Sequence, residues 1–484
     1  IRDSLISVQF NLSCDQLKLV ISSFSKGMLM NPLTEASGTE TKISSWPPAP
    51  AAWYTVGLLF LAYTFSFVDR FILTLLIEPI KQDFNLSDTG VSLLVGFAFV
   101  IFYTFLGIPI GRLADRVNRR NLIVAGITLW SCMTALCGLA RGFGALFVAR
   151  VGVGVGEAAL SPAAYSMIAD LFPPKKLGRA LSVYTAGAFV GVGLALIVGG
   201  IVVQSVVSSP NMTVPFIGTI RSWQAPFFIV GLPGLLVAAL MYTVREPVRR
   251  QPSTDQSNSS NEVVSLKEAF DYIRQRASIY LSHFFGFALL GVASNVLFVW
   301  GPHILARSFA VPVGEAGTTI GLIVLSFGTV GLIAGGFLSD RLLKVGHLDN
   351  GMRVGIIAAL CGIPFALLLP FMGSLVTLLL VFCPLVMFAC LGFGASAAAL
   401  QQVTPNRLRG VVSGCYFFLL NVIGIGLSPS LTAVMTDYVF KDELMVVNSV
   451  SVMAVGSSVL AAAILWRGLK PYREESALRV DLSV

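Results

Sequence analysis

The sequence contains little charge. Only 12% of its 484 residues are Asp, Glu, Lys or Arg, whereas 55% are hydrophobic. A soluble globular domain has about 25% charged residues, so much of the surface of this protein is expected to face lipid. Lys and Arg outnumber Asp and Glu to give a net charge of +8. Such an excess could indicate nucleic-acid binding, so its distribution along the chain has to be considered.

Residues that build metal and redox sites are also scarce. There are three scattered histidines and seven cysteines without a CxxC pair, too few and too dispersed for a metal site or a disulfide framework. The stretch GVGVGE at 152–157 lies inside an apolar run and lacks the Gly-Lys-Ser/Thr of a nucleotide-binding loop. The sequence therefore predicts no bound cofactor, no metal, no direct use of ATP and no enzymatic activity.

Long hydrophobic runs, by contrast, are abundant. Twelve stretches are long and apolar enough to cross a bilayer as helices, which takes about 20 residues each. They are expected at 54–77, 90–111, 121–140, 144–169, 179–204, 223–244, 279–304, 315–339, 352–371, 375–402, 410–435 and 448–467. The predicted fold is an all-α integral membrane protein with twelve transmembrane helices.

The twelve predicted spans form two similar groups of six. GRLADR at 111–116, after span 2, resembles GFLSDR at 336–341, after span 8. PKKLGRALSV at 174–183, before span 5, likewise resembles PNRLRGVVSG at 405–414, before span 11. The distance along the chain between the two members is nearly the same for both pairs, which indicates a tandem duplication. Two repeated halves that face each other around a midplane site are the architecture of many secondary transporters.

The expected domain organisation follows from this division. Met28 or Met30 would be a natural start, so residues 1–27 could lie upstream of the true start. The parts are a disordered N-terminal tail at 1–50, a six-helix half at 51–244, a cytoplasmic linker with an amphipathic helix at 245–277, a second six-helix half at 278–468 and a cytoplasmic tail at 469–484.

The basic residues are concentrated on one side of the predicted spans. The loops after even-numbered spans and the C-terminal tail, counted with the residues at their edges, contain 22 Lys and Arg, and the loops after odd-numbered spans contain five. Basic loops stay in the cytoplasm, so both termini are expected there, with the protein in the inner cell membrane. Membrane topology explains the positive charge, and no nucleic-acid partner is expected.

Charged residues also occur inside two predicted spans. Asp69 and Arg70 interrupt span 1 in the stretch SFVDRFILTLL, although each charge costs at least ~2.5–3.5 kcal/mol at the bilayer centre. Arg150 and Glu157 lie two helical turns apart on one face of span 4, at depths that bracket Asp69. Such charges usually mark an ion or substrate pathway. A neutral cluster that only locks two helices together is the alternative.

The loop GIPIGRLADRVNRR at 107–120 resembles the signature loop of the major facilitator superfamily, and GFLSDR repeats it in the second half. The resemblance implies two six-helix halves around a central cavity that spans 1 and 4 line. It also implies a gating motif, in which Gly111 permits a close helix approach and Asp115 pairs with an arginine across the cytoplasmic gate. The other residues assigned to this motif are Arg116, Arg119, Arg120, Asp340 and Arg341.

Two longer stretches, 67–116 and 150–184, are similar to the Spinster family, whose animal members export sphingosine-1-phosphate or lysophospholipids. The C-terminal half shows only features general to the superfamily. The resemblance implies that Asp69 and Glu157 couple transport to protons, and that Arg70, Arg150 and Glu157 contact the substrate.

Other polar and small residues of the spans are weaker candidates. Asn295 in span 7, Tyr103 in span 2 and Tyr184 in span 5 could bind a head group, or could simply pack. The glycines of span 5 are expected to pack closely against the other half; they are Gly187, Gly191, Gly193, Gly199 and Gly200.

The sequence as a whole predicts a proton-coupled secondary transporter that works by alternating access, as a monomer, on an amphipathic lipid such as a lysophospholipid or sphingoid phosphate. A close alternative keeps the fold and changes the cargo, as in a drug/proton antiporter or an organic-anion transporter. A membrane receptor on a transporter scaffold is a third possibility, and the gating motifs in both halves argue against it.

Overall fold

The structure is a computed structural model that describes residues 46–114, 116–207, 211–214, 218–249, 266–405 and 408–481. The predicted disordered tail, apart from residues 46–50, lies outside the described residues. So do Asp115 and residues 250–265 of the predicted linker. The chain divides into two units, 1–47 and 48–484, and all of the helices described below belong to the second unit.

Twelve helices in the described chain are long and apolar enough to cross a membrane, so the predicted all-α fold with twelve spans is confirmed. The lengths of spans 1 and 12 differ most from expectation. Both helices are longer than predicted, because polar helical turns continue beyond the apolar run. The spans are 49–84, 88–107, 119–137, 143–171, 176–206, 222–241, 277–309, 313–344, 350–371, 375–403, 409–440 and 443–479.

The N-terminal half consists of spans 1 to 6, several of which contain short 3₁₀ or π segments (labelled η). A two-stranded antiparallel hairpin that the sequence did not predict follows span 5 and pairs Met212 with Ile220. The elements are α2 (Ala49–Phe71), η1 (Ile72–Leu76), α3 (Ile77–Phe84), α4 (Asp88–Ser92), η2 (Leu93–Phe97), α5 (Ala98–Ala114), α6 (Arg119–Cys137), α7 (Phe143–Glu157), α8 (Leu160–Leu171), α9 (Pro174–Val207), β1 (Met212–Val214), β2 (Gly218–Ile220), η3 (Ser222–Gln224), α10 (Ala225–Gly231) and α11 (Pro233–Met241).

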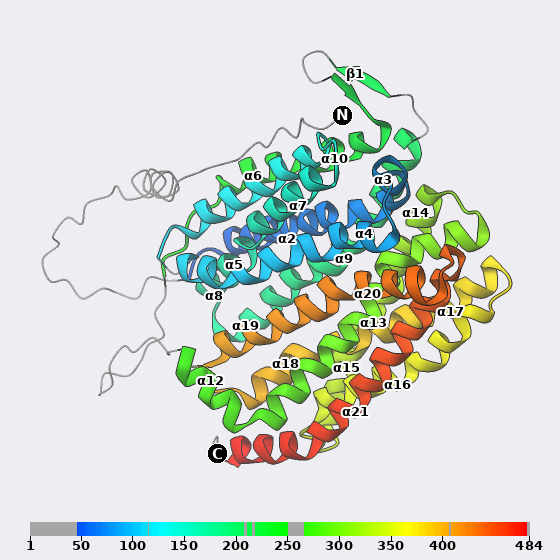
Figure 1. Ribbon diagram of the computed structural model, residues 1–484. Coiled ribbons are helices and arrows are strands. Elements are labelled where there is room, and N and C mark those ends of the chain that lie inside the picture. The colour runs from blue at the N-terminus through cyan, green and yellow to red at the C-terminus, as the bar shows by residue number, and fades with distance from the viewer. Residues whose placement is uncertain are drawn as a thin grey trace, which may run out of the picture. The chain divides into compact units, whose positions relative to one another are not determined.

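The C-terminal half begins with a short amphipathic helix and continues with spans 7 to 12. The elements are α12 (Leu266–Gln275), α13 (Ala277–Phe309), α14 (Val313–Ile323), η4 (Val324–Gly328), α15 (Thr329–Lys344), α16 (Asn350–Leu368), η5 (Leu369–Phe371), α17 (Leu375–Leu391), α18 (Phe393–Val403), α19 (Arg409–Leu419), η7 (Leu420–Leu427), α20 (Ser428–Val434), η8 (Met435–Phe440), η9 (Glu443–Met445) and α21 (Val446–Asp481). Figure 1 shows these helices, from green to red, beside those of the N-terminal half.

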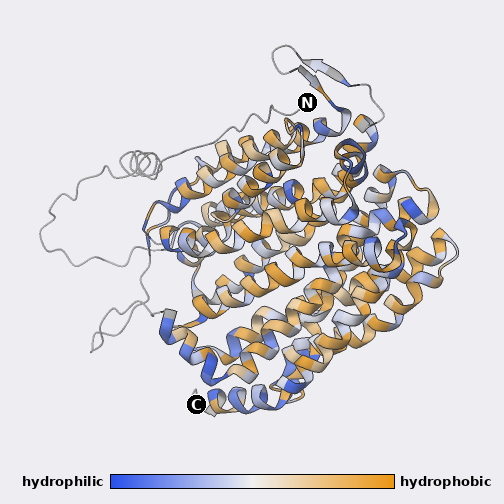
Figure 2. Ribbon diagram, in the orientation of Figure 1, coloured by the Kyte–Doolittle hydropathy of each residue, from blue (hydrophilic) through white to orange (hydrophobic). Residues whose placement is uncertain are grey.

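The outer surface of the helical bundle is apolar. Large hydrophobic side chains such as Val148, Leu236, Val376 and Leu380 are about two-thirds exposed. Figure 2 shows that hydrophobic residues dominate the spans, while hydrophilic residues gather at helix ends and on α12 and the last turns of α21. A soluble protein rarely exposes so much contiguous apolar surface. These helices therefore form a lipid-facing surface, with their backbone hydrogen bonds satisfied within each helix.

Within the described residues, the buried core that combines both halves lies near one face of the molecule. We call the face with Lys81 and Asp88, where span 1 ends and span 2 begins, the Lys81 face, and the opposite face the Arg119 face. Near the Lys81 face, one cluster of buried residues combines both halves. Towards the Arg119 face, three further clusters belong wholly or almost wholly to one half each. The halves are therefore packed together most continuously at the Lys81 face.

Close glycine contacts join the halves where span 5 meets span 8. A Cβ at Gly193 would lie 2.8 Å from Leu325 of η4, and one at Gly200 would overlap the carbonyl oxygen of Gly314 of α14. Small residues allow this backbone approach. The prediction for span 5 is thus correct for these two glycines, whereas three others face span 1 of the same half, namely Gly187, Gly191 and Gly199.

A glycine pair on α15 offers a direct test of helix packing. A Cβ at Gly335 would overlap the Leu391 carbonyl oxygen of α17, whereas one at Gly336 would lie 3.9 Å from the nearest atom. We expect Gly335→Ala to lower stability by ~1–3 kcal/mol, because the backbones must separate. Gly336→Ala should be neutral or stabilising, since Ala favours helix by up to ~1 kcal/mol. Thermal unfolding in detergent measures both, and equal melting temperatures would contradict the packing argument.

Candidate functional site

The structure brings the four charged residues of spans 1 and 4 together. Asp69 and Arg70 lie at the end of α2, and Arg150 and Glu157 lie on α7. Their exposed fractions are 0% for Asp69, 6% for Arg70, 0% for Arg150 and 2% for Glu157. Charges buried to this extent require specific partners to offset their desolvation. Three of the four side chains have hydrogen-bond partners among the described residues, and that of Asp69 has none.

Arg70 and Glu157 form the central ion pair. Arg70 Nη2 donates to Glu157 Oε2 at 2.6 Å. The guanidinium of Arg70 also lies over aromatic rings, with its carbon 4.2 Å from the centroid of Phe99, 4.6 Å from Phe67 and 5.3 Å from Tyr103. Cation–π contacts of this kind stabilise a desolvated guanidinium. Arg70 Nε and Glu157 Oε1 nevertheless have no hydrogen-bond partner in the described residues.

Arg150 makes a different set of contacts, because its guanidinium binds backbone rather than a carboxylate. It donates from Nη1 to the Asp69 carbonyl at 3.2 Å, from Nη2 to the Arg70 carbonyl at 3.2 Å and from Nε to the Leu94 carbonyl at 3.4 Å. The first two carbonyls lie where α2 gives way to the 3₁₀ segment η1. Arg150 thus holds this junction in place, and in this conformation its nitrogens are engaged.

Asp69 is the least satisfied member of the cluster. It lies among Glu157, Arg150 and the indole of Trp130, yet neither carboxyl oxygen has a hydrogen-bond partner in the described residues. An ionised carboxylate without hydrogen bonds is costly to bury. The site therefore contains one paired carboxylate and one unpaired carboxylate on adjacent helices.

Glycines of α7 allow the cluster to form. A Cβ at Gly154 would lie 2.5 Å from the Phe99 carbonyl oxygen of α5, and one at Gly156 would lie 2.6 Å from the Trp130 nitrogen of α6. Any side chain at these positions would push α7 away from α5 and α6. Because Glu157 follows directly, this close approach fixes the position of its carboxylate beside Arg70.

The three other residues predicted to bind a head group, Tyr103, Tyr184 and Asn295, lie in different surroundings. Tyr103 stacks on Phe99 at 5.3 Å and so lies beside the central pair. Tyr184 is buried, stacks on Tyr63 at 4.7 Å and shares a hydrogen bond of 3.3 Å with Ser161. Asn295 donates to Ser428 Oγ at 2.9 Å, which joins spans 7 and 11 of the C-terminal half. Only Tyr103 is thereby brought together with the charge cluster.

The predicted gating motif is organised around Arg119. This buried side chain pairs with Asp170 at the end of α8 and with Glu246 after span 6, the latter at 2.7 Å. Neither partner could be recognised from the sequence, because charges at helix ends are common and their pairing is not local. Arg120 donates from its backbone to Glu246 at 2.9 Å.

Other members of the motif contribute less to packing in this conformation. A Cβ at Gly111 would lie 3.7 Å from Pro162, an ordinary contact, so the expected close helix approach at Gly111 is not found. The remaining three described members of the motif are exposed side chains, namely Arg116, Asp340 and Arg341. The pairing expected for Asp115 lies outside the described residues.

Ion pairs at the Arg119 face that lie within the described residues join residues of the same half. In the C-terminal half, Asp349 before α16 pairs with Arg353 at 2.7 Å and with Arg473 of α21 at 2.8 Å. Burial raises the pKa of Asp349, but hydrogen bonds from Arg353 and Arg473 lower it more, so its pKa lies below the ordinary value. These contacts stabilise one half without closing it against the other.

A second charged cluster, which the sequence analysis did not identify, joins the two halves at the Lys81 face. We call it the inter-half ion cluster, and it consists of Glu78, Lys81, Asp88, Arg307 and Glu443. Arg307 of α13 pairs with Glu78 and Asp88, each at 2.6 Å. Lys81 pairs with Asp88 at 2.5 Å and with Glu443 at 2.9 Å. Its only sequence signal is that Lys81 and Arg307 are two of the five basic residues on this side.

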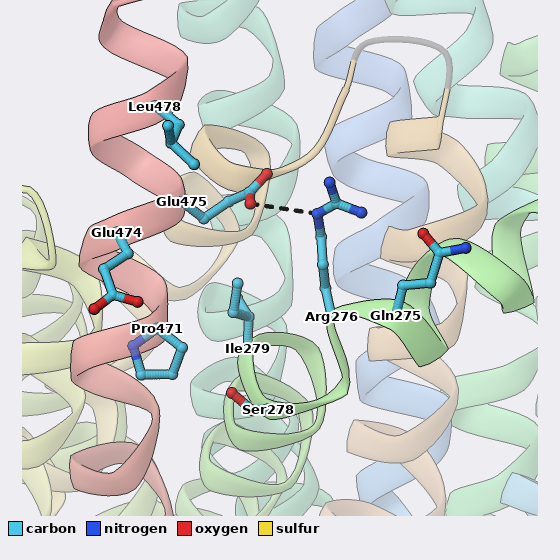
Figure 3. Close-up of a pocket in the computed structure, with 8 residues that line it drawn as sticks. All are labelled: Gln275, Arg276, Ser278, Ile279, Pro471, Glu474, Glu475 and Leu478. Atoms are coloured by element: carbon cyan, nitrogen blue, oxygen red, sulfur yellow. Dashed lines mark hydrogen bonds and ion pairs between the residues drawn. The ribbon is translucent and has the colours of Figure 1, made fainter.

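A pocket of about 260 Å³ lies on the Arg119 face between α13 and α21. Figure 3 shows that Arg276 and Glu475 face each other across it, and they pair at 3.3 Å. None of its lining residues belongs to the central charge cluster. The described residues contain no group of three or more His, Cys, Asp or Glu side chains arranged to hold a metal ion.

Comparison with known proteins agrees with this fold. A family model for the Major Facilitator Superfamily matches residues 59–429. An MFS-type efflux pump of Mycolicibacterium smegmatis is 29% identical over 81% of this chain and 86% of its own length, and protein spinster homolog 1 of Xenopus laevis is 28% identical over 84% and 77%.

Among solved structures, a bacterial homologue of the human lysosomal transporter Spinster, inward-facing and unoccupied, has a TM-score of 0.71 and 26% identity. The alignment covers 89% of this chain and 98% of that structure.

The chain therefore belongs to the major facilitator superfamily, a class of membrane transporters with twelve spans in two halves. Within it, the similarity to Spinster proteins in both sequence and structure makes this a Spinster-type transporter, as the stretches 67–116 and 150–184 implied.

Proposed function

We propose that this protein is a proton-coupled transporter of an anionic amphipathic lipid, such as a lysophospholipid or a sphingoid phosphate. The observation that carries the proposal is the buried Arg70–Glu157 pair, at 2.6 Å, beside the unpaired carboxyl of Asp69. A cation, an exchangeable anionic partner and a second carboxyl together provide what cargo binding and proton movement require.

Arg70 is the cation best placed for a phosphate-bearing head group. A guanidinium matches phosphate oxygens in a bidentate manner, and Arg70 Nε has no hydrogen-bond partner within the described chain. Arg150, also a candidate, already donates to three carbonyls and is proposed to position the site. The rings of Phe67, Phe99 and Tyr103 around Arg70 supply apolar surface for the carbons next to the head group.

Proton coupling follows from competition for Arg70. A cargo phosphate that takes the place of Glu157 on Arg70 removes the charge partner that keeps Glu157 ionised. A buried carboxylate without a partner is costly, so Glu157 takes up a proton when cargo binds. Asp69, close to Glu157 and without hydrogen bonds, is proposed to exchange that proton with solvent when the halves change orientation.

The transport cycle is proposed to be alternating access by a monomer. The shared core and the inter-half ion cluster support a conformation closed at the Lys81 face. The excess of basic residues at the Arg119 face supports a cytoplasmic location for that face and for both termini. On this orientation, in the inner cell membrane, the described conformation is closed to the outside.

A second candidate keeps the mechanism and changes the cargo to a drug or an organic anion. It is favoured by the similarity to the Mycolicibacterium smegmatis efflux pump and by 24% identity over 83% of the chain to a probable L-galactonate transporter of Escherichia coli. A receptor that does not transport has no comparable support among these relatives.

A panel of cargo in liposomes distinguishes these functions. The purified protein is offered labelled lysophospholipids, sphingosine with and without its phosphate, a hexuronate and a cationic drug, each with and without a pH gradient. We expect accumulation of the phosphate-bearing lipids that depends on the gradient, with weaker transport of unphosphorylated sphingosine. Gradient-driven uptake of the hexuronate or the drug alone would contradict the lipid proposal and support the second candidate.

A further inference from the structure

A buried histidine, His303, lies beside the inter-half ion cluster. His303 lies on α13, four residues before Arg307, and is completely buried. Its Nε2 lies 2.8 Å from the Thr74 carbonyl oxygen of η1, and its Nδ1 lies 3.5 Å from Glu78 Oε1. We propose that His303 and Glu78 form a proton-binding site, and that a proton bound there locks the two halves together at the Lys81 face.

The hydrogen bonds of His303 decide which nitrogen takes the proton. A carbonyl oxygen can only accept, so Nε2 must carry a hydrogen and donate it to Thr74. In neutral imidazole the other nitrogen then carries only a lone pair. Nδ1 therefore presents a lone pair to the carboxylate of Glu78, and it has no hydrogen-bond partner in the described chain. A proton on Nδ1 converts this contact into a charge-assisted hydrogen bond.

The net negative charge around His303 also favours a proton on its Nδ1. The groups of the cluster are Glu78 and Lys81 on α3, Asp88 on α4, Arg307 on α13 and Glu443 on η9. Three carboxylates and two cations leave one negative charge uncompensated when His303 is neutral. Asp437 of η8, which accepts from Thr89 at 2.7 Å, adds a further negative charge nearby, and Glu315 of α14, the helix that follows α13, is exposed. Protonated His303 supplies the missing positive charge.

The site joins both halves, which gives the proton a conformational effect. Glu78 and Thr74 belong to span 1, and His303 belongs to span 7. Separation of the halves at the Lys81 face removes Glu78 from His303, so the proton binds more tightly when this face is closed. A ligand shifts an equilibrium towards the state that binds it better. Acid should therefore favour closure at this face, with the side chain of Glu78, 26% exposed, as the route for the proton.

This inference concerns the closure of one face and needs no knowledge of the cargo, so its failure is distinguishable from failure of the proposed function. The experiment places a pair of spectroscopic labels on unnatural amino acids at Gln82 and Phe371, which lie on the Lys81 face in different halves and are exposed. The full-length protein in nanodiscs, without cargo, is titrated between about pH 5 and pH 8, the range in which histidine changes charge.

The ratio of closed to open populations is expected to rise on acidification, by up to about tenfold per pH unit for one linked proton. In His303→Gln, whose amide can still donate to Thr74, the slope of the logarithm of this ratio against pH should fall by up to about one proton. The matched control is His283→Gln. His283 is also buried on α13, with Nε2 2.9 Å from the Ser396 carbonyl and Nδ1 without a partner among the described residues, but it pairs with no carboxylate there.

Glu78→Gln provides a second variant if His303→Gln does not fold, and it should reduce the slope in the same way. His283→Gln should keep the wild-type slope. A wild-type slope in His303→Gln or Glu78→Gln, or an equal loss in His283→Gln, would overturn the proposal.

Discussion

Asp69→Asn is expected to abolish the accumulation of cargo driven by a pH gradient, while cargo binding persists. Asparagine is nearly isosteric with aspartate but cannot exchange a proton with solvent. Because both Asp69 oxygens lack hydrogen-bond partners within the described residues, the substitution removes a poorly satisfied group, and stability should change by no more than ~1 kcal/mol. Uptake into proteoliposomes with and without a gradient measures coupling, and cargo binding to the detergent-solubilised variant measures the site.

The matched control for this prediction is Asp170→Asn. Asp170 pairs with Arg119 and lies away from the proposed proton pathway, at the end of α8. Its replacement should lower stability, since Arg119 is buried. The protein that folds should still accumulate cargo in response to the pH gradient. If Asp69→Asn concentrates cargo at the wild-type rate, the proton-carrier role is wrong, and the charged cluster serves only to hold spans 1 and 4 together.

Glu157→Gln is expected to lower stability and to uncouple cargo binding from proton uptake at this position. It leaves Arg70, 6% exposed, without the carboxylate that pairs with it at 2.6 Å. Removal of one partner of a buried pair costs ~3–5 kcal/mol, and the amide oxygen, which can still accept a hydrogen bond, places this variant near the lower limit. Because the cargo phosphate is proposed to displace Glu157 from Arg70, and the neutral amide stands in for protonated Glu157, binding of a phosphate-bearing lipid to the folded variant should persist and should lose the part of its pH dependence that comes from Glu157.

A double-mutant cycle separates the pair from its surroundings. Arg70→Gln together with Glu157→Gln removes both charges, so the loss of stability should be smaller than the sum of the two single losses. Thermal unfolding and lipid binding are measured for the wild type, both single variants and the double variant. Additive losses would mean that Arg70 and Glu157 are not energetically coupled, which contradicts the central role of the pair.

Much of the architecture could be predicted because the bilayer imposes it locally. A helix must present about 20 apolar residues to the lipid, so each span can be recognised without knowledge of any other, and all twelve are confirmed. The residues of the central cluster were also predictable. Charges are rare in membrane spans, which makes four residues conspicuous: Asp69, Arg70, Arg150 and Glu157. All four also lie in the stretches that resemble the Spinster family.

The partners of these residues could not be predicted in the same way. Arg70 rather than Arg150 pairs with Glu157, and Arg150 donates to carbonyls at the junction of α2 and η1. That choice depends on how far α7 rotates and approaches α5 and α6, which Gly154 and Gly156 determine. Helical spacing places Arg150 and Glu157 on one face of α7, but it contains no information about the rotation of that face relative to span 1.

The sequence by itself determined the membrane class, the number of spans, the duplication of six helices and the identity of the central charged residues. Only the tertiary structure decided how charges far apart in the chain meet. In the inter-half ion cluster, Lys81 contacts Glu443, 362 positions away, and His303 contacts Glu78 across the two halves. The physical reason is that hydropathy acts on each segment separately, whereas an ion pair requires two segments to be placed within about 4 Å of each other.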